Sequence, residues 1–400
     1  MRIRILLFSF FLPFFILACA SSEATTENVR KTAKSSSATL ALVNGVLIDG
    51  TGSYPMNDAV IVINENRIVS VGSRSQVSIP ADTPVIDIHG ATILPGFINT
   101  HVHGAYDRDA LEEWAQNGVT TVRDLGIVGN NSNLTDLFGF RDEISQDSRY
   151  ARLVVVGPMI TVPGGYGSRY VTSPAHAKET TEFLLDVGAD LIKIGIEDNL
   201  QGRRWQMLSY DEITAIVESA HARNVFVSAH ISRSAHLELA LQTGVDDVAH
   251  MIIDELSDDL ISRMIEADMY WEPTLELWQC VSELHQLSWN TQAIDNLQRF
   301  SEAGGKVALG SDYGGYRCEF DLGMPMREIE LMLRAGMSPL QIIVAGTKNA
   351  AHVCNLGDEI GTLESGKVAD ILVVAGNPLE DIQALEDVMM VIHNGEIIRE

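Results

Sequence analysis

The sequence predicts an α/β protein, a (β/α)8 TIM barrel with a small β-sandwich domain built from both chain ends. Between residues 94 and 354, short β-branched runs alternate with longer amphipathic stretches, which is typical of parallel βα units. At residues 39–93 and 355–400, apolar and polar residues alternate around turn signals, which favours antiparallel strands. The 400 residues are 46% hydrophobic and 20% charged, so the chain can bury a large core.

The first 18 residues have the pattern of a removable signal peptide. Arg2 and Arg4 precede an apolar run that ends at small residues around Cys19. The run is shorter than the roughly 20 residues of a membrane span and contains Pro13, which argues against a transmembrane anchor. Because the residues before Cys19 resemble a bacterial lipobox, we expect Cys19 to be lipidated, with plain secretion as the alternative. The protein is then exported, as a periplasmic or outer-membrane lipoprotein of a bacterium, and residues 19–38, which are small and polar, are its flexible tether.

The two β-rich ends are expected to form one sandwich, because neither end has enough strands to bury a face alone. In the first part, Asn44-Gly45 and residues 64–66 are predicted to be turns. In the second part, Asn394-Gly395 is the corresponding turn.

The middle of the chain contains eight runs that we predict to be barrel strands. A helical stretch follows most of them; in residues 210–223, for example, apolar residues recur at helical spacing at Ile213, Ile216, Val217 and Ala220. The eight strands end near residues 101–103, Asp124, Gly157, Lys193, His230, His250, Pro273 and Asp312.

Composition excludes nucleic acid as a partner. The chain has 28 Lys and Arg residues against 54 Asp and Glu, a formal net charge of -26, which is unsuited to binding phosphates. Besides Cys19, only Cys280, Cys318 and Cys354 are present, and their spacing matches no zinc motif. We expect three buried free thiols, with a single Cys280–Cys318 bridge as the alternative in an oxidising compartment.

Polar side chains close five of the predicted strands, and in a barrel such ends meet at one mouth. His101 and His103 face the same way, because side chains alternate along a strand. Singly, each polar residue has a structural explanation; Asp312, for example, would serve as a helix cap. Jointly, four imidazoles and a carboxylate favour a divalent transition metal, with zinc as the first candidate. The residues are His101, His103, Lys193, His230, His250 and Asp312.

Lys193 is a charged residue flanked by aliphatic residues in a predicted strand. Burying it is costly unless the ammonium is paired or chemically changed. Reaction of the amine with CO2 would give a carbamate, an anionic oxygen ligand able to bridge two metal ions. The alternatives are a salt bridge to Glu197 or Asp124, and an ammonium that binds substrate.

Several motifs occur in a fixed order along the chain: PGFINTHVH, GVTTVRDLG, LIKIG, SAH, DDVAH, PTL, GSDYG, SPLQIIVAGTKNAA and IGTLESGKVADILVVAGNPLEDI. Together they resemble the amidohydrolase superfamily, in particular the imidazolonepropionase-like branch that also contains carboxylated-lysine Xaa-dipeptidases. The resemblance covers residues 39–400 and implies a metal-dependent hydrolase of carbon–nitrogen bonds.

The resemblance also implies a role for each polar strand end. His101 and His103 would hold a first ion and His230 and His250 a second, the two being bridged by carboxylated Lys193. Asp312 would complete the shell of the first ion and act as general base toward a metal-activated water. A single ion without the bridge is the alternative.

Two positions depart from the pattern of this branch. The Gly-Gly-His-Gly loop after the third strand has Tyr166 in place of histidine, and a second histidine expected after His230 is replaced by Ser232. We expect Tyr166, Arg169 and Tyr170 to bind a substrate carboxylate. The alternative is aromatic packing in an ordinary glycine-rich loop.

The expected activity is hydrolysis of an amide bond in a small molecule, a dipeptide or an N-acyl amino acid. Cyclic-amide hydrolysis, deamination and lactone hydrolysis are alternatives on the same metals, and a catalytically silent scaffold or binding protein is the alternative from another class. Membrane contact is expected only through a lipid on Cys19, and a homo-oligomer is expected because members of this branch often associate.

Overall fold

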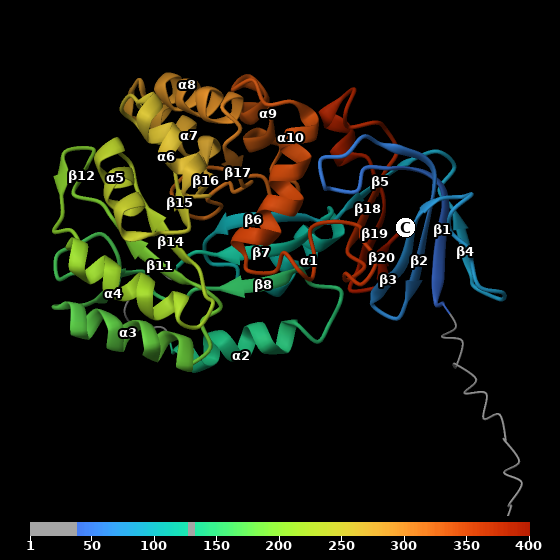
Figure 1. Ribbon diagram of the computed structural model, residues 1–400, viewed down its shortest axis with the longest axis horizontal. Helices are drawn as coiled ribbons and strands as arrows, with labels where there is room; N and C mark the ends of the chain where they lie inside the picture. Colours follow the sequence, from blue (N-terminus) through green and yellow to red (C-terminus); the bar gives the residue numbers. More distant parts are fainter. Residues whose placement is uncertain (1–37, 127–132) are drawn as a thin grey trace, which may run out of the picture. The chain divides into compact units, whose positions relative to one another are not determined.

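The computed structural model describes residues 38–126 and 133–400 (Figure 1). The predicted signal peptide at residues 1–18, the predicted lipidation at Cys19 and all but the last residue of the predicted tether at 19–38 lie outside the described residues. Among the helices that are described, none is long and apolar enough to cross a membrane.

The barrel predicted from the sequence is present. Its parallel strands pair in two runs, in the orders β6-β7-β8 and β11-β14-β15-β16-β17. Between the runs, β9 (Ile160–Thr161) continues from β8 and pairs with β11. On the other side, Thr100 N–H donates to Leu309 O at 2.9 Å, which joins β6 to the segment after β17 and closes the barrel. The strands are β6 (Phe97–Val102), β7 (Val119–Asp124), β8 (Arg152–Val155), β11 (Ile192–Gly195), β14 (Val227–His230), β15 (Asp247–Ala249), β16 (Tyr270–Glu272) and β17 (Lys306–Val307).

Helices alternate with these strands. In α4 (Tyr210–His221) the predicted apolar stripe is buried, and Ser209 and Glu212 form a capping box that begins the helix. The helix ends at His221, two residues before its predicted end, and Ala222 is its C-cap. The other helices are α1 (Arg108–Gln116), α2 (Leu134–Ile144), α3 (Pro174–Asp186), α5 (Ser234–Thr243), α6 (Asp258–Glu266), α7 (Leu275–His285), α8 (Trp289–Glu302), α9 (Met326–Arg334), α10 (Pro339–Val344) and α11 (Ala350–Val353).

Both chain ends contribute strands to one further sheet, as predicted (Figure 1). Its strand order is β20-β19-β18-β5-β1-β2-β3, with β4 paired to β1, so the junction between the two ends is the antiparallel pair β5 and β18. The strands are β1 (Leu40–Leu47), β2 (Met56–Asn64), β3 (Arg67–Ser73), β4 (Val85–Asp87), β5 (Thr92–Pro95), β18 (Ile371–Val374), β19 (Val388–His393) and β20 (Glu396–Arg399).

Side-chain alternation places this sheet against the barrel. On β18, Leu372 and Val374 belong to the same buried cluster as the barrel residues, whereas Ile371 and Val373 pack in a separate cluster within the sheet domain. One face of β18 therefore covers the barrel and the other faces the core of the sandwich.

The turn predicted at Asn44-Gly45 is wrong. Strand β1 continues through both residues and pairs with β2 on either side of a register shift between Val43 and Gly45. Asn44 has a φ of 60°, which is typical of a bulge residue, so the Asn-Gly pair bends the strand instead of reversing it. The Asn394-Gly395 turn connects β19 to β20, with both residues at positive φ.

The expectation of three free thiols is also wrong. Cys280, on α7, forms a disulfide with Cys318, since the two Cα atoms lie 6.2 Å apart, a separation that a disulfide can span. Cys354 is buried and is the free cysteine of the described chain.

Candidate metal centre

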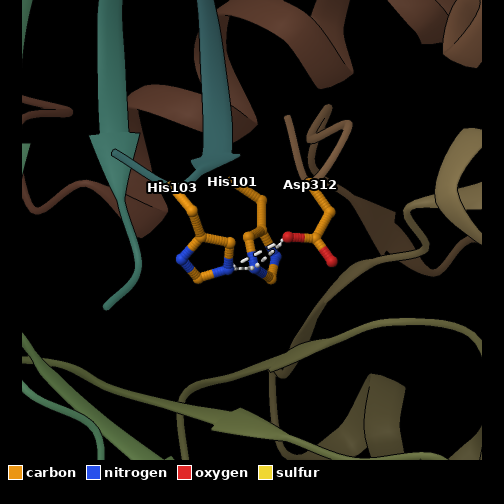
Figure 2. Close-up of side chains that lie close together, drawn as sticks. All are labelled: His101, His103 and Asp312. Atoms are coloured by element: carbon orange, nitrogen blue, oxygen red, sulfur yellow. Dashed lines mark hydrogen bonds and ion pairs between the residues drawn. The ribbon is translucent and has the colours of Figure 1, made fainter. Parts of the chain in front are cut away.

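Two histidines and an aspartate meet at the carboxyl end of the barrel (Figure 2). His101 lies on β6, His103 follows that strand, and Asp312 follows β17. Asp312 Oδ1 lies 3.0 Å from His103 Nε2 and 3.4 Å from His101 Nε2. One ligand atom from each residue fits within 4.8 Å of the others, so the three can share one ion.

The hydrogen bonds of His103 show that this cluster requires a cation. His103 Nδ1–H donates to Gly126 O at 2.8 Å, so the Nε2 lone pair of the neutral ring faces the Asp312 carboxylate. Burial lowers the pKa of His103, but Asp312, Asp124 and the Gly126 carbonyl together outweigh burial and raise that pKa to about 9. A proton or a metal ion is therefore needed between the two groups, and two imidazole nitrogens with one carboxylate oxygen suit a divalent metal.

His230 and His250 lie beside this cluster, at the ends of β14 and β15. The ring centroids of His230 and His250 are 4.5 Å apart, and those of His101 and His250 are 4.8 Å apart. Burial lowers the pKa of both rings, that of His250 well below its ordinary value, so both are neutral and can offer lone pairs. His230 Nε2 has no hydrogen-bond partner in the described chain.

Lys193 lies inside the barrel on β11, with 2% of its surface exposed. Its Nζ donates to Ser228 Oγ at 3.2 Å, a hydroxyl and not the carboxylate that usually accompanies a buried lysine. Burial lowers the pKa of Lys193 to about 8. The two alternative salt bridges are not formed, because Asp124 accepts backbone N–H groups and Glu197 faces His230.

The backbone is strained at three positions around the centre. His250, Thr274 and Asp312 have φ values of 77°, 45° and 60°, in the left-handed region that non-glycine residues rarely adopt. Such conformations cost about 1–3 kcal/mol each and persist only where the surrounding structure enforces them. Thr274 uses this position to place Oγ1 3.0 Å from His250 Nδ1.

Sequence reasoning missed Glu272, the last residue of β16. Its Oε2 lies 3.7 Å from His101 Nδ1, and neither atom has a hydrogen-bond partner in the described chain. Its Oε1 pairs with Arg123, which also pairs with Asp247. A carboxylate on the Nδ1 side of an imidazole fixes the tautomer and turns Nε2 toward a metal. The available signal was an acidic residue directly before Pro273 at a predicted strand end.

A second missed group contains Glu197, Asp198 and His236. Glu197 is fully buried, and its Oε2 lies 3.5 Å from His230 Nε2 and 3.9 Å from His236 Nδ1. Asp198 Oδ1 lies 3.0 Å from His236 Nε2. The available signal was the spacing of Glu197, four residues after Lys193 and thus on the same face of an extended chain.

A cavity of about 190 Å³ lies over the centre and is lined by His230, His250 and Asp312. Its other walls are largely aromatic, with Tyr166, Trp205, Trp278 and Tyr316 among the lining residues. The Tyr166 ring stacks on His230 with centroids 4.1 Å apart. Gly195 allows this approach, because a Cβ at that position would lie 2.1 Å from Tyr166 O.

The structure separates the three residues expected to bind a substrate carboxylate. Tyr166 lines the cavity, whereas Arg169 lies over the Phe183 ring and Tyr170 is 42% exposed, and neither is among the lining residues. Arg203, in the β12–β13 hairpin (Asn199–Leu200 and Arg203–Arg204), is the one Arg or Lys among the described residues that line the cavity.

The barrel and its histidine–aspartate centre define a class of metal-dependent hydrolases. The model of the amidohydrolase family matches residues 92–398, so the chain belongs to that family, as its motifs predicted, and is a hydrolase of carbon–nitrogen bonds.

Comparison with known proteins gives relatives across most of the chain. The chain is 24% identical over 412 residues to ochratoxinase of Aspergillus niger. The matched region covers 87% of this chain and 84% of that protein. The chain is also 24% identical over 375 residues to imidazolonepropionase of Symbiobacterium thermophilum, covering 80% and 86% respectively. A solved structure of a Xaa-Pro dipeptidase with methionine bound in the active site is similar with a TM-score of 0.76 and 24% identity, over 90% of this chain and 100% of that one.

Proposed function

We propose that the protein hydrolyses the amide bond of a dipeptide or an N-acyl amino acid at a centre of two zinc ions. The observation that carries this proposal is the clustering of four imidazoles and one carboxylate at the end of the barrel. His230, His250 and Asp312 of this cluster line one cavity. When bound, the ions would polarise the scissile carbonyl and lower the pKa of a water molecule.

The side chains divide the work by position. His101 and His103 would hold one ion with Asp312, and His230 and His250 the other. Lys193 is buried next to the Ser228 hydroxyl, and burial lowers the pKa of its amine. The neutral amine is suited to react with CO2 and, as a carbamate, to bridge the ions. Asp312 lines the cavity, where its carboxylate can accept a proton from the attacking water and return it to the leaving amine.

The substrate is expected to carry a free carboxylate, because Arg203 supplies the one guanidinium among the described residues that line the cavity. Its guanidinium lies over the Trp205 ring, 5.3 Å from the centroid. A carboxylate bound there would form a charge-assisted, bidentate hydrogen bond. The aromatic walls favour an apolar side chain next to the scissile bond.

Metal analysis of the purified protein, with bicarbonate supplied during expression, tests the centre. We expect about two ions per chain in the wild type, and about one or none in Lys193→Ala. Lys178→Ala, which changes an exposed lysine, is the matched control and should keep both ions. One ion in every protein would overturn the bridge, and no ion in any of them would overturn the metal centre.

Turnover of dipeptides and N-acyl amino acids, and of the same compounds with the carboxylate converted to an amide, tests the substrate class. Arg203→Met should raise KM for the free acids about 10- to 100-fold, the loss of one charge-assisted hydrogen bond. It should change little for the capped compounds. Arg204→Met removes the neighbouring guanidinium, which does not line the cavity, and is the matched control. Equal effects of Arg203→Met on both sets of compounds would contradict carboxylate binding.

A cyclic amide is the second candidate substrate, because several of the relatives are imidazolonepropionases. Ring opening uses the same attack of water on an amide carbonyl and leaves both products in one molecule. Hydrolysis of cyclic amides in the same assay, without hydrolysis of linear amides, would favour this candidate.

We propose that the protein works outside the cytoplasm as a lipoprotein anchored through Cys19. The signal-peptide pattern supports this location, and so does the Cys280–Cys318 bridge, since such bonds persist in oxidising compartments. Metabolic labelling with a fatty acid in a bacterial host should label the wild type and not Cys19→Ser. If neither the wild type nor Cys19→Ser carries the label and both are released in soluble form, plain secretion would be favoured.

A further inference from the structure

Glu197 is a buried carboxylate with an unused oxygen. Its side chain is 0% exposed, and its Oε1 accepts the backbone N–H of Asn199 at 2.9 Å. Its Oε2 has no hydrogen-bond partner in the described chain. Leaving a buried carboxylate oxygen unsatisfied is costly, so this atom requires a cationic or donating partner.

The unused oxygen points at an equally unused nitrogen. Glu197 Oε2 lies 3.5 Å from His230 Nε2, which also has no hydrogen-bond partner within the described residues. Ligand atoms bound at about 2.0–2.2 Å to one zinc ion are about this far apart in tetrahedral geometry. The pair therefore has the spacing of two ligands of one ion.

His236 lies next to the Glu197 carboxylate and itself contacts Ser232 and Asp198. His236 Nδ1 is 3.9 Å from this oxygen and lies 3.4 Å from the Ser232 N–H, while its Nε2 contacts Asp198 Oδ1. Glu197 supplies an anionic oxygen at this end of the centre.

We propose that Glu197 is a direct ligand of the ion held by His230. This inference rests on the proposed function, because it assumes a second ion at His230 and His250. It adds to that site a carboxylate from the segment after β11. The second ion then has a protein carboxylate whose charge does not depend on CO2, and its binding is less sensitive to bicarbonate than a bridging carbamate alone would make it.

Metal content and Co2+ titration followed by visible absorption test this assignment without relying on activity. Glu197→Gln keeps the size of the side chain but removes its charge. We expect it to lower the ion content from about two to about one per chain. The affinity of the second Co2+ binding step should fall at least tenfold, because even residues that only contact a metal ligand cost about 10- to 100-fold in metal affinity when they are mutated. Glu302→Gln, which changes an exposed glutamate on α8, is the control and should keep both ions.

Each outcome separates the inference from the proposed function. Two ions in the wild type and in Glu197→Gln, with unchanged Co2+ affinity, would overturn the role of Glu197 and leave the binuclear centre standing. A change of KM alone in Glu197→Gln would likewise overturn it and assign Glu197 to the substrate. Fewer than two ions in the wild type would overturn the binuclear centre itself. Thermal unfolding of the metal-free variants confirms that each one is folded.

Discussion

The polar atoms around the centre are arranged as acceptors that face other acceptors. His103 Nε2 faces Asp312 Oδ1, His230 Nε2 faces Glu197 Oε2, and the positive backbone φ of Asp312 contributes strain. In the absence of cations these contacts are repulsive or require extra protons. Metal binding is therefore expected to relieve electrostatic repulsion and to stabilise the native state, with a free energy that grows with the logarithm of the ion concentration.

Glu272 is expected to position His101 for metal binding. Glu272→Gln removes the carboxylate that lies 3.7 Å from His101 Nδ1, so the affinity for the first ion should fall about 10- to 100-fold. Asp247→Asn is the matched control, because Asp247 also pairs with the buried Arg123 but is not paired with His101. Isothermal titration with Zn2+ measures both. Similar losses in the two variants would mean that Glu272 acts only through Arg123.

Sequence reasoning found the residues that lie at strand ends in recognisable motifs, and it missed those whose role depends on a partner far away in the chain. His101 and His103 are visible as a pair because strand geometry places them on one face. Glu272 acquires its role only because β16 and β6 bring it within 3.7 Å of His101. The sequence pointed to Arg169 through its proximity to Tyr166, and it gave no signal for Arg203, because the β12–β13 hairpin is too short to show a periodic pattern.

At the scale of elements, the cavity walls are loops and helices that follow the strands. Trp278 lies on α7, and Tyr316 lies in the segment after Asp312. The Cys280–Cys318 disulfide connects these two elements close to both aromatic residues. The disulfide therefore fixes the separation between two walls of the cavity and leaves the metal ligands untouched.

Loss of the disulfide should affect substrate binding more than metal binding. The double variant Cys280→Ser/Cys318→Ser is expected to lose about 3 kcal/mol of unfolding free energy, a typical value for a disulfide of this kind. We also expect KM to rise while metal content stays the same. Denaturant unfolding and steady-state kinetics measure the two effects, and Cys354→Ser is the control with a single buried thiol. A loss of bound metal in the double variant would contradict this division.

Helices α7 and α9 bring together two buried acids. Glu328 Oε2 accepts the backbone N–H of Glu276 at 2.7 Å, and burial raises the pKa of each carboxyl to about 8, helped at Glu276 by Glu328. Because the native state keeps protons that the unfolded state releases above its ordinary pKa of about 4.5, stability should be highest at acidic pH and decline as pH rises toward 8.

Removing one of these acids should flatten that pH dependence. In Glu276→Gln, Tm of the metal-free protein should fall less between pH 5 and pH 8 than it does in the wild type. Differential scanning calorimetry at a series of pH values measures the slope. Glu302→Gln, which changes an exposed glutamate on α8, should retain the slope of the wild type. Parallel curves for Glu276→Gln and the wild type would contradict the assignment.

At the scale of the whole molecule, the sheet domain is joined to the barrel by a small number of polar contacts in addition to apolar packing. Asp370, just before β18, accepts Arg152 Nη1 at 2.7 Å and the backbone N–H of Asn394 at 2.8 Å. Arg152 begins β8, so this ion pair connects the barrel directly to the C-terminal strands. Asp370 is 4% exposed, and the Arg152 guanidinium keeps the pKa of this buried carboxyl below its usual value despite the burial.

Asp370→Asn should destabilise the protein by about 3 kcal/mol, the lower end for breaking a buried ion pair, because Arg152 is partly exposed. Denaturant unfolding measures the loss. Asp381→Ala, which removes the N-cap of the short 3-10 helix Ile382–Glu386, is the control and should cost about 1 kcal/mol. A loss for Asp370→Asn no larger than that of the control would show that apolar packing alone joins the two parts.

The barrel and the shared sheet followed from periodicity because both depend on patterns that repeat many times along the chain. The alternation of strand and helix is repeated through the barrel, so an error in one boundary does not change the architecture. A single Asn-Gly pair has no such support, and Asn44-Gly45 proved to be a bulge because its neighbours continue to pair with β2. The cysteine pairing depended on a spatial distance between Cys280 and Cys318 that no spacing in the sequence reveals.

The pairing of β5 with β18 also sets the order of events during folding. Ile93 pairs with Val373, so the sheet closes only after nearly the whole chain has been synthesised, and closing so large a loop carries an entropy cost that local contacts do not. Until then β5 keeps an unpaired edge. A chain that terminates before β18 would retain the barrel strands but expose this edge to other chains, which makes premature termination a direct route to aggregation.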